Sequence, residues 1–242
     1  MKLDLIAFGA HPDDVELFAG GTLAKMAALG HAVGIVDLTR GEAGTRGNAA
    51  IRSREARKAA RILKAKIREN LELPDGEICV TSEARNKIIR IVREFRPSLV
   101  LTHHWDDRHP DHTNTSRLVS AAVHHAGLAK IKTGQERFRP GTILYFKLPA
   151  GMHPSLIVDV SEFDDKKIQA IRCHRSQLFN PKSDKPETYL SQPDFLARID
   201  SLHSYYGAII GKRKGEGFYV KGMLEVPDPV DFFNHMSPLR FI

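Results

Sequence analysis

Two short segments of this 242-residue chain combine histidines and aspartates at spacings that suit a metal ion. They are His11-Pro12-Asp13-Asp14 and His109-Pro110-Asp111-His112. Histidine nitrogens and carboxylate oxygens are ordinary ligands of zinc, which in catalytic sites takes three protein ligands and a water. One turn of chain can direct His11 and Asp14 at a single point, and His112 would complete a set of two imidazoles and one carboxylate.

Asp13 lies beside these expected ligands without being needed as one. A carboxylate next to a metal-activated water is a natural general base. The alternative interpretation is a helix N-cap with an acidic first turn, to which Glu16 also belongs. Capping accounts for Asp13 or Asp14 but not for His11, nor for the second segment. The residues therefore favour a metal site and leave capping as the alternative.

Short apolar runs alternate with amphipathic segments, a pattern typical of βαβ units with right-handed crossovers. We expect strands at Leu3–Ala10, Ala32–Thr39, Ile67–Leu73 and Ser98–His103. We expect helices at Glu16–Leu29, Ile51–Ala65, Ser82–Phe95 and Thr113–Ala126. The predicted fold class is α/β, a Rossmann-like and mostly parallel sheet with helices on both faces.

The second half of the chain is less regular. Strands are expected at Thr142–Leu148 and Leu156–Val160, and helices at Glu162–Arg175 and Asp194–Tyr205. The proline-rich segment Asn180–Pro193 is expected to be a loop and a candidate lid. We expect an irregular tail that docks on the body or on another subunit; it is Pro227–Ile242, with the apolar residues Phe232, Phe233, Leu239, Phe241 and Ile242. We expect one domain over residues 1–242, with its Rossmann-like core at about 1–160.

The predicted strand order explains how the two His/Asp segments could meet. Each segment directly follows a strand, the first and the fourth in the chain. In an open sheet ordered 3-2-1-4, these two strands flank the point where the winding reverses. Ligands bind there, outside the carboxyl ends of the strands. The sequence therefore predicts one site built from both segments.

Together, the two segments resemble the paired motif of the PIG-L/LmbE-like zinc N-deacetylases. The resemblance covers His11 to Glu16 and Asp107 to His112, and returns more weakly at Ser176-Gln177 and at Gly215 to Phe218. Within the family, the likeness is to bacillithiol-biosynthesis deacetylases and bacterial chitooligosaccharide deacetylases. It implies a Zn²⁺-dependent hydrolase, although Fe²⁺ accepts the same ligands. It also implies a homo-oligomer, a hexamer in many relatives.

The resemblance also implies roles for single residues. His11, Asp14 and His112 match the family's metal ligands, and Asp13 its general base. Protonated His109 would stabilise the oxyanion, and Asp111 would hold His109 in the right tautomer. Where relatives often carry Tyr before the Ser-Gln pair, this chain has Cys173-His174-Arg175.

Arginines follow the second predicted strand and suggest how a substrate is held. Arg52 matches a substrate-contacting arginine of the family, and Arg46 and Arg108 are further candidates. Arg40, Arg46, Arg52 and Arg54 fall near one expected rim, where guanidinium forks suit carboxylates. A solvated basic helix is the alternative. The resemblance implies N-acetylglucosaminyl-malate as the anionic substrate, and its rival is a neutral chitooligosaccharide or another GlcNAc conjugate.

Composition further limits the kind of partner and the cellular compartment that we expect for this protein. The net charge is +7, but the basic residues are scattered, so we expect an anionic small molecule rather than nucleic acid as the partner. No apolar run is long enough for a membrane span or a signal peptide, so we expect a cytoplasmic protein. Cys79 and Cys173 are expected to be reduced. A non-enzymatic Rossmann-like nucleotide binder is the remaining alternative, although Gly20-Gly21 lies inside a predicted helix and is no dinucleotide fingerprint.

Overall fold

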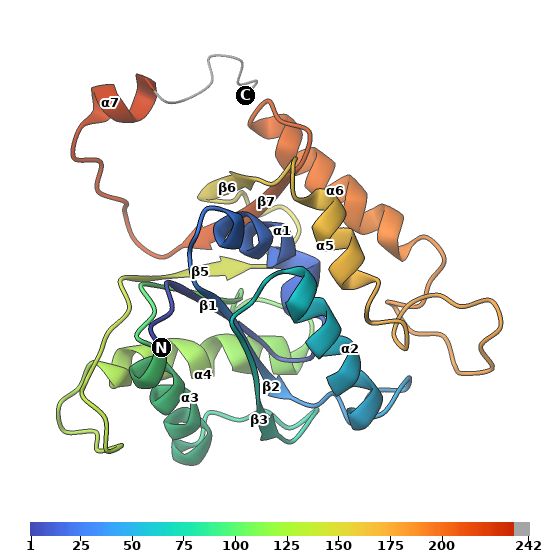
Figure 1. The fold of residues 1–242 in the computed structure, drawn as a ribbon, viewed down its shortest axis with the longest axis horizontal. Helices are drawn as coiled ribbons and strands as arrows, with labels where there is room; N and C mark the ends of the chain where they lie inside the picture. Colours follow the sequence, from blue (N-terminus) through green and yellow to red (C-terminus); the bar gives the residue numbers. More distant parts are fainter. Residues whose placement is uncertain (235–242) are drawn as a thin grey trace.

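Parallel strands form the centre of the protein, of which a computed structural model describes residues 1–234 (Figure 1). The parallel strands are β1 (Leu5–Gly9), β2 (Val33–Thr39), β3 (Ile67–Leu73), β4 (Leu99–His103) and β5 (Thr142–Phe146). With β6 (Leu156–Asp159) and β7 (Gly215–Val220) they form a sheet ordered β3-β2-β1-β4-β5-β7-β6. The predicted α/β class and the 3-2-1-4 order are confirmed.

Helices cover both faces of the sheet. On one face, α3 (Ser82–Phe95) and α4 (Pro110–Ala126) contribute side chains to a buried apolar cluster. On the other face, α1 (Asp14–Ala28), α2 (Ala49–Ile62) and α5 (Asp164–Ile171) contribute to a second cluster. Helix α6 (Phe195–Ile209) lies beside α5 (Figure 1). Burial of these two clusters supplies the main driving force for this fold.

Strand β1 lies between β2 and β4, and all five of its residues are buried. Leu5 pairs with Val33 on one side and with Leu99 on the other. Because the pairing is parallel on both sides, the loops that leave the carboxyl ends of β1 and β4 emerge at the same edge. These loops carry the two His/Asp segments.

The C-terminal third departs most from the sequence-based expectations. Strand β7 was not predicted, and it lies antiparallel between β5 and β6. Its glycines, Gly215 and Gly217, weaken the strand pattern. The predicted helix Glu162–Arg175 is shorter and ends at Ile171. Beyond its end, Ser176 donates hydrogen bonds through its backbone N–H and its hydroxyl to Glu55 of α2, at 2.8 and 2.7 Å.

The tail also differs from the expected irregular segment. It forms a short helix, α7 (Pro229–Asn234), and all of residues 222–234 are exposed. Leu239, Phe241 and Ile242 of the expected docking tail lie outside the described residues. Within residues 1–234, no helix is long and apolar enough to span a bilayer. Both cysteines have free thiols.

A buried ion pair joins helix α1 to the C-terminal elements. Lys167 of α5 and Glu216 of β7 are almost wholly buried, and Lys167 Nζ lies 2.5 Å from Glu216 Oε1. The Glu216 carboxylate also accepts hydrogen bonds from the backbone N–H groups of Gly21 and Thr22. A Cβ on Gly20 would lie 3.3 Å from Lys167, so the glycine pair lets this ion pair approach α1 closely. Gly20-Gly21 therefore serves packing rather than nucleotide binding.

Replacing Glu216 with alanine should destabilise the protein strongly. The substitution leaves the buried Lys167 ammonium and the α1 N–H groups without their acceptor, and breaking such a pair typically costs about 3–5 kcal/mol. The free energy of unfolding from urea titration measures the loss. Glu225→Ala, at an exposed position, is the matched control and should change that free energy little. Equal values for the two variants would contradict the assignment.

Candidate functional site

The structure brings the three expected metal ligands together where β1 and β4 end. His11 comes from the loop after β1, Asp14 is the first residue of α1, and His112 comes from the first turn of α4. Asp14 Oδ1 lies 3.3 Å from His112 Nε2, and Asp14 Oδ2 lies 3.4 Å from His11 Nδ1. One ligand atom from each of the three residues falls within 4.8 Å of the others.

These spacings fit a tetrahedral ion. Zinc–ligand distances of about 2.0–2.1 Å place the ligand atoms of a tetrahedron about 3.3–3.4 Å apart. The two carboxylate–imidazole distances, 3.3 Å to Oδ1 and 3.4 Å to Oδ2 of Asp14, are each close to that edge length. Asp14 and His112 are buried, and His11 is nearly so. The donor set therefore fits a divalent cation with a coordination position left for water or substrate.

A carboxylate contacts the far nitrogen of each imidazole, His11 and His112, and no role was predicted for these carboxylates from the sequence. His11 Nε2 lies 3.0 Å from Asp75 Oδ1, and His112 Nδ1 lies 3.2 Å from Asp107 Oδ2. Such outer partners fix the tautomer of a metal-binding histidine and direct its other nitrogen to the ion. Asp75 follows β3 at the same edge of the sheet, so its place after a strand was the signal that could have identified it.

The Asp14 carboxylate is kept in its deprotonated form, as a metal ligand must be. Burial alone would raise the pKa of Asp14, but His112 and His103 outweigh that effect and hold it well below its usual range. His103 Nε2 lies 3.1 Å from Asp14 Oδ2, and its ring stacks on His112 at a centroid distance of 4.1 Å. Burial lowers the pKa of His103 to about 3, so its ring is neutral. His103 thus supports the site, whereas His104 stacks on Trp105 instead.

The pKa of His11 shifts in the opposite direction, upward. Burial opposes its protonation, but hydrogen bonds to Asp111, Asp14 and Asp75 raise the pKa of His11 well above the usual value. A proton therefore competes with a cation for this imidazole. Because a ligating histidine must be neutral, cation binding would release that proton, and the affinity should rise with pH.

Asp13 occupies a strained backbone conformation beside the ligands. Its φ is +135°, where residues other than glycine are rare, and such strain concentrates at functional sites. Although Asp13 stands at the N-cap position of α1, its side chain makes no capping hydrogen bond. Burial raises the pKa of Asp13, with Arg52 opposing the shift. A raised pKa brings a carboxylate closer to the value that suits a general base near neutral pH.

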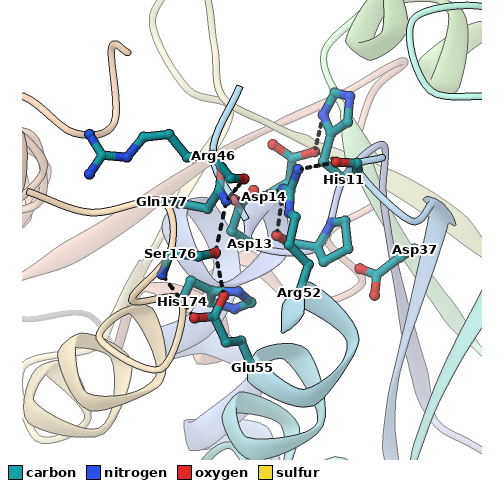
Figure 2. Close-up of polar contacts among 12 residues, drawn as sticks. His11, Asp13, Asp14, Asp37, Arg46, Arg52, Glu55, His174, Ser176 and Gln177 are labelled. Atoms are coloured by element: carbon teal, nitrogen blue, oxygen red, sulfur yellow. Dashed lines mark hydrogen bonds and ion pairs between the residues drawn. The ribbon is translucent and has the colours of Figure 1, made fainter. Parts of the chain in front are cut away.

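Arg52 holds Asp13 in place. Its Nη2 donates to Asp13 Oδ2 at 3.1 Å and to Pro12 O at 3.0 Å, and its Nη1 donates to Gly41 O at 3.0 Å (Figure 2). Gly41 has a positive φ, and a Cβ there would lie 2.0 Å from the guanidinium. The guanidinium is therefore already engaged with the protein, although Arg52 also lines the cavity described below.

His109 and Asp111 lie together, but not as expected. The backbone N–H of Asp111 donates to His109 Nδ1 at 3.2 Å, so His109 caps α4. The Asp111 carboxylate instead accepts from the N–H groups of Gly76 and Ile78 and lies 3.5 Å from His11 Nε2. Asp111 thus sets the tautomer of His109 through its backbone rather than its carboxylate, with the proton on Nε2.

The pKa of His109 shifts in the direction opposite to the expected imidazolium. Burial lowers the pKa of His109, and the nearby imidazoles of His112 and His11 lower it further. A depressed histidine pKa favours the neutral ring at neutral pH. A neutral ring with its proton on Nε2 still offers an N–H donor, and His109 lines the cavity. The geometry suits hydrogen-bond stabilisation of an oxyanion without a full positive charge.

A cavity of about 910 Å³ opens over the candidate ligands. Besides the candidate ligands, its charged lining residues are Asp13, Arg52, Asp75, Asp106, Asp107, Arg108, Lys147 and Arg198. Its apolar wall includes Leu17, Phe18, Leu190, Phe195, Ile199 and Leu202. The size suits a small molecule of one or two rings.

The four arginines after β2 do not form one rim. Among them, Arg52 lines the main cavity, while Arg40 lines a separate hollow. Figure 2 shows the Arg46 side chain pointing away from Asp13. Arg108 does line the cavity and stacks on Tyr189 at 4.7 Å.

The segment between α5 and α6 closes one side of the cavity. Thr188, Tyr189 and Leu190, from the predicted lid segment, line it. Gln177 also lines it and donates to the backbone oxygen of Arg46 at 2.7 Å (Figure 2). His174 is buried, lies 3.3 Å from Glu16 and does not line the cavity.

Comparison with known proteins points to one family. The sequence profile described as "PIG-L: GlcNAc-PI de-N-acetylase" matches residues 6–123, which contain both His/Asp segments. A diacetylchitobiose deacetylase of Thermococcus kodakarensis is 30% identical, over 96% of this chain and 85% of its own length.

Two further relatives extend the comparison. A probable N-acetyl-α-D-glucosaminyl L-malate deacetylase 2 of Bacillus anthracis is 31% identical, over 72% of this chain and 80% of its own length. The crystal structure of the conserved protein TT1542 from Thermus thermophilus superposes with a TM-score of 0.84 at 38% identity, covering 93% of this chain and 98% of that one. The likeness thus extends well beyond the two segments.

Substitutions at Asp13 and His112 should separate catalysis from metal binding. Asp13→Asn keeps the ligand set and should retain the bound metal while losing about 10²- to 10⁴-fold in deacetylase turnover. His112→Ala should lose both the metal and the turnover. Elemental analysis and rate measurements on the same preparations test this, with His124→Ala on the exposed side of α4 as control. An Asp13→Asn variant with full activity would remove the base assignment.

Proposed function

The chain belongs to the GlcNAc-PI de-N-acetylase (PIG-L) family, and on this premise we propose that it is a zinc-dependent N-deacetylase of a GlcNAc conjugate. The observation that carries the proposal is Asp13. This buried carboxylate, with a raised pKa, stands next to the His11–Asp14–His112 set without belonging to it. A metal-assisted hydrolase needs this combination of a ligand set and a separate base.

Each residue has a part in amide hydrolysis. A divalent ion held by His11, Asp14 and His112 would acidify water and polarise the acetyl carbonyl. Asp13 accepts the proton of the attacking water, and Arg52 keeps its carboxylate aimed at the site. The Nε2–H of His109 donates to the oxyanion, and loss of such a donor typically costs about 100- to 1000-fold in rate. Asp13, which took the proton of the attacking water, then delivers it to the leaving amine, which yields acetate and a free amino sugar.

The cavity offers a basis for choosing the aglycone. Arg52 is paired with Asp13, Lys147 with Asp107, and Arg198 with Asp194. Arg108, by contrast, has no carboxylate partner among residues 1–234, and its guanidinium lies over the Tyr189 ring. An unpaired guanidinium at a cavity wall favours an anionic group on the substrate. We therefore favour N-acetylglucosaminyl-malate, in bacillithiol biosynthesis, over a neutral chitooligosaccharide.

Deacetylation assays on two substrates test this choice. Zinc-loaded protein should release acetate from N-acetylglucosaminyl-malate with a higher kcat/KM than from diacetylchitobiose, and a chelator should abolish both activities. Arg108→Gln should raise KM for the malate conjugate about tenfold or more, because it removes a bidentate, charged contact. The same variant should leave the chitobiose KM nearly unchanged. The reverse substrate preference would select the chitooligosaccharide, and no release from either would refute the deacetylase.

The exposed segment 222–234 supports the proposal of a homo-oligomeric assembly. A hexamer, the form of many relatives, is one such assembly. Six apolar side chains of this segment are exposed: Met223, Leu224, Val226, Val230, Phe232 and Phe233. Figure 1 shows α7 standing clear of the sheet and its helices. Contiguous exposed apolar groups of this kind mark interaction sites. The segment holds Glu225, Asp228 and Asp231 and no basic residue, whereas the whole chain carries +7, so a second copy is complementary in charge.

Charged substitutions in α7 should therefore dissociate the assembly. A Phe232→Asp/Phe233→Asp double variant should elute at a smaller mass than the wild type in size-exclusion chromatography with light scattering. Tyr205→Asp, at an exposed position on α6, is the control and should leave the mass unchanged. A wild-type protein that is monomeric at all concentrations would exclude the assembly.

A further inference from the structure

We propose that the apolar wall of the cavity binds the acyl group of the substrate, so that the enzyme also hydrolyses N-acylglucosamines whose acyl chains are longer than acetyl. The inference rests on the proposed function, because it assigns the acyl specificity of the same site. An acetyl group has one methyl to set against this wall. The wall is formed by α1, α6 and the segment before α6, through Leu17, Phe18, Leu190, Phe195, Ile199 and Leu202.

Two of these side chains lie one helical turn beyond the general base and the ligand. The backbone N–H of Leu17 donates to Asp13 O at 3.0 Å, and Phe18 follows Asp14 by four residues on α1. Side chains of a helix lean toward its N-terminus, so Leu17 and Phe18 lean over the turn that carries the two aspartates. The apolar wall therefore begins beside the point where the acyl carbonyl is polarised.

Helix α6 continues the wall. Phe195, Ile199 and Leu202 follow one another at spacings of four and three residues, so they share the face of α6 that lines the cavity. Phe195 and Ile199 also belong, with Leu17, to one buried cluster, which joins α6 to α1. Leu202 is only half-buried, so its side chain is available to a bound molecule. The wall thus extends from the metal site along both helices.

The other side of the metal site is polar. In the sheet, β2 and β3 lie on one side of β1, whereas β7, against which α6 packs, lies beyond β4 and β5 on the other side. The loops after β2 and β3 bring Gly44, Asp75 and Gly76 to the cavity. Backbone groups and a carboxylate suit the hydroxyls of a sugar, whereas an apolar wall suits a hydrocarbon chain. The amide joins these two parts of the substrate, so each part can meet the side that matches it.

A longer acyl group is removed by the same bond changes as acetyl. The oxygen of water bonds to the acyl carbon, the C–N bond breaks, and the proton of the water passes through Asp13 to the amine. The products are a free amino sugar and a fatty acid in place of acetate. Each methylene that the wall buries in the transition state should raise kcat/KM about fourfold.

Two isomeric substrates test the assignment of the wall to the acyl group. Methyl N-hexanoylglucosaminide and pentyl N-acetylglucosaminide carry the same number of added methylenes relative to methyl N-acetylglucosaminide, the first in the acyl group and the second in the aglycone. With metal-loaded protein, the hexanoyl isomer should exceed the methyl acetyl compound in kcat/KM by about tenfold or more. The pentyl isomer should gain less than about threefold.

Calorimetry on metal-free protein gives a second readout, which does not depend on turnover. The hexanoyl isomer should bind more tightly than the pentyl isomer, with a more negative change in heat capacity, because more apolar surface is buried. Tighter binding of the pentyl isomer would assign the wall to the aglycone and overturn the proposal.

A variant of the wall completes the test. Leu202→Asn places an amide in the wall and should lower the ratio of hexanoyl to acetyl kcat/KM about tenfold, because the amide must be desolvated against the acyl chain. Tyr205→Asn, at an exposed position on the same helix, is the matched control and should leave the ratio unchanged. If Leu202→Asn does not fold, Leu202→Ala is compared in the same way.

The outcomes separate this proposal from the proposed function. Hydrolysis of the acetyl compound with no gain for the hexanoyl isomer, or an unaltered ratio in the folded Leu202 variant, would overturn the acyl assignment alone. Hydrolysis of neither compound would instead refute the proposed function itself.

Discussion

The parallel pairing of β1 with β4 is the constraint on which the rest of this structure depends. The register that aligns Leu5 with Leu99 and Ala7 with Leu101 brings two loops, about a hundred residues apart in sequence, to one edge of the sheet. Because β1 is buried on both faces, that register resists slippage. The two histidines and the aspartate that converge there owe their proximity to this pairing.

Close packing of acidic and imidazole groups creates the second constraint. Buried carboxylates are costly unless they are paired or bound to a cation. Asp14 faces His11, His103 and His112, and Asp13 faces Arg52. Each imidazole expected to hold the ion has a carboxylate behind it, Asp75 or Asp107. The site is thus built of alternating charges around one point, and a divalent ion there would satisfy the lone pairs that converge on it.

The sequence predicted the centre of the site better than its surroundings. His11, Asp14 and His112 could be grouped because each lies just after a recognisable strand. The place of Leu202 in the cavity wall could not be predicted in this way, because an apolar face on a helix indicates a buried core and does not show that the face lines a cavity. The Asp111 carboxylate was expected at His109, but the capping of α4 by His109 uses the Asp111 backbone and frees that carboxylate for Gly76 and Ile78.

The fold, too, was predicted well in one part and poorly in another. The alternating strands and helices of the first half were predictable because apolar periodicity repeats there. Strand β7 was missed because Gly215 and Gly217 interrupt the pattern, and both are required by close packing: a Cβ at either would lie within 3.0 Å of the backbone or ring of Tyr206. Glu216 between them reaches the backbone of α1, a contact across some two hundred residues that no local signal could reveal.

X-ray absorption at the zinc edge tests the central claim most directly. Protein reconstituted with one equivalent of zinc should show a low-coordinate ion with two imidazole nitrogens and otherwise oxygen ligands, at about 2.0–2.1 Å. The imidazole signal should fall to one ring in a His112→Gln variant. A spectrum with sulfur ligands, or with water oxygens alone, would contradict a metal centre built from the loops after β1 and β4.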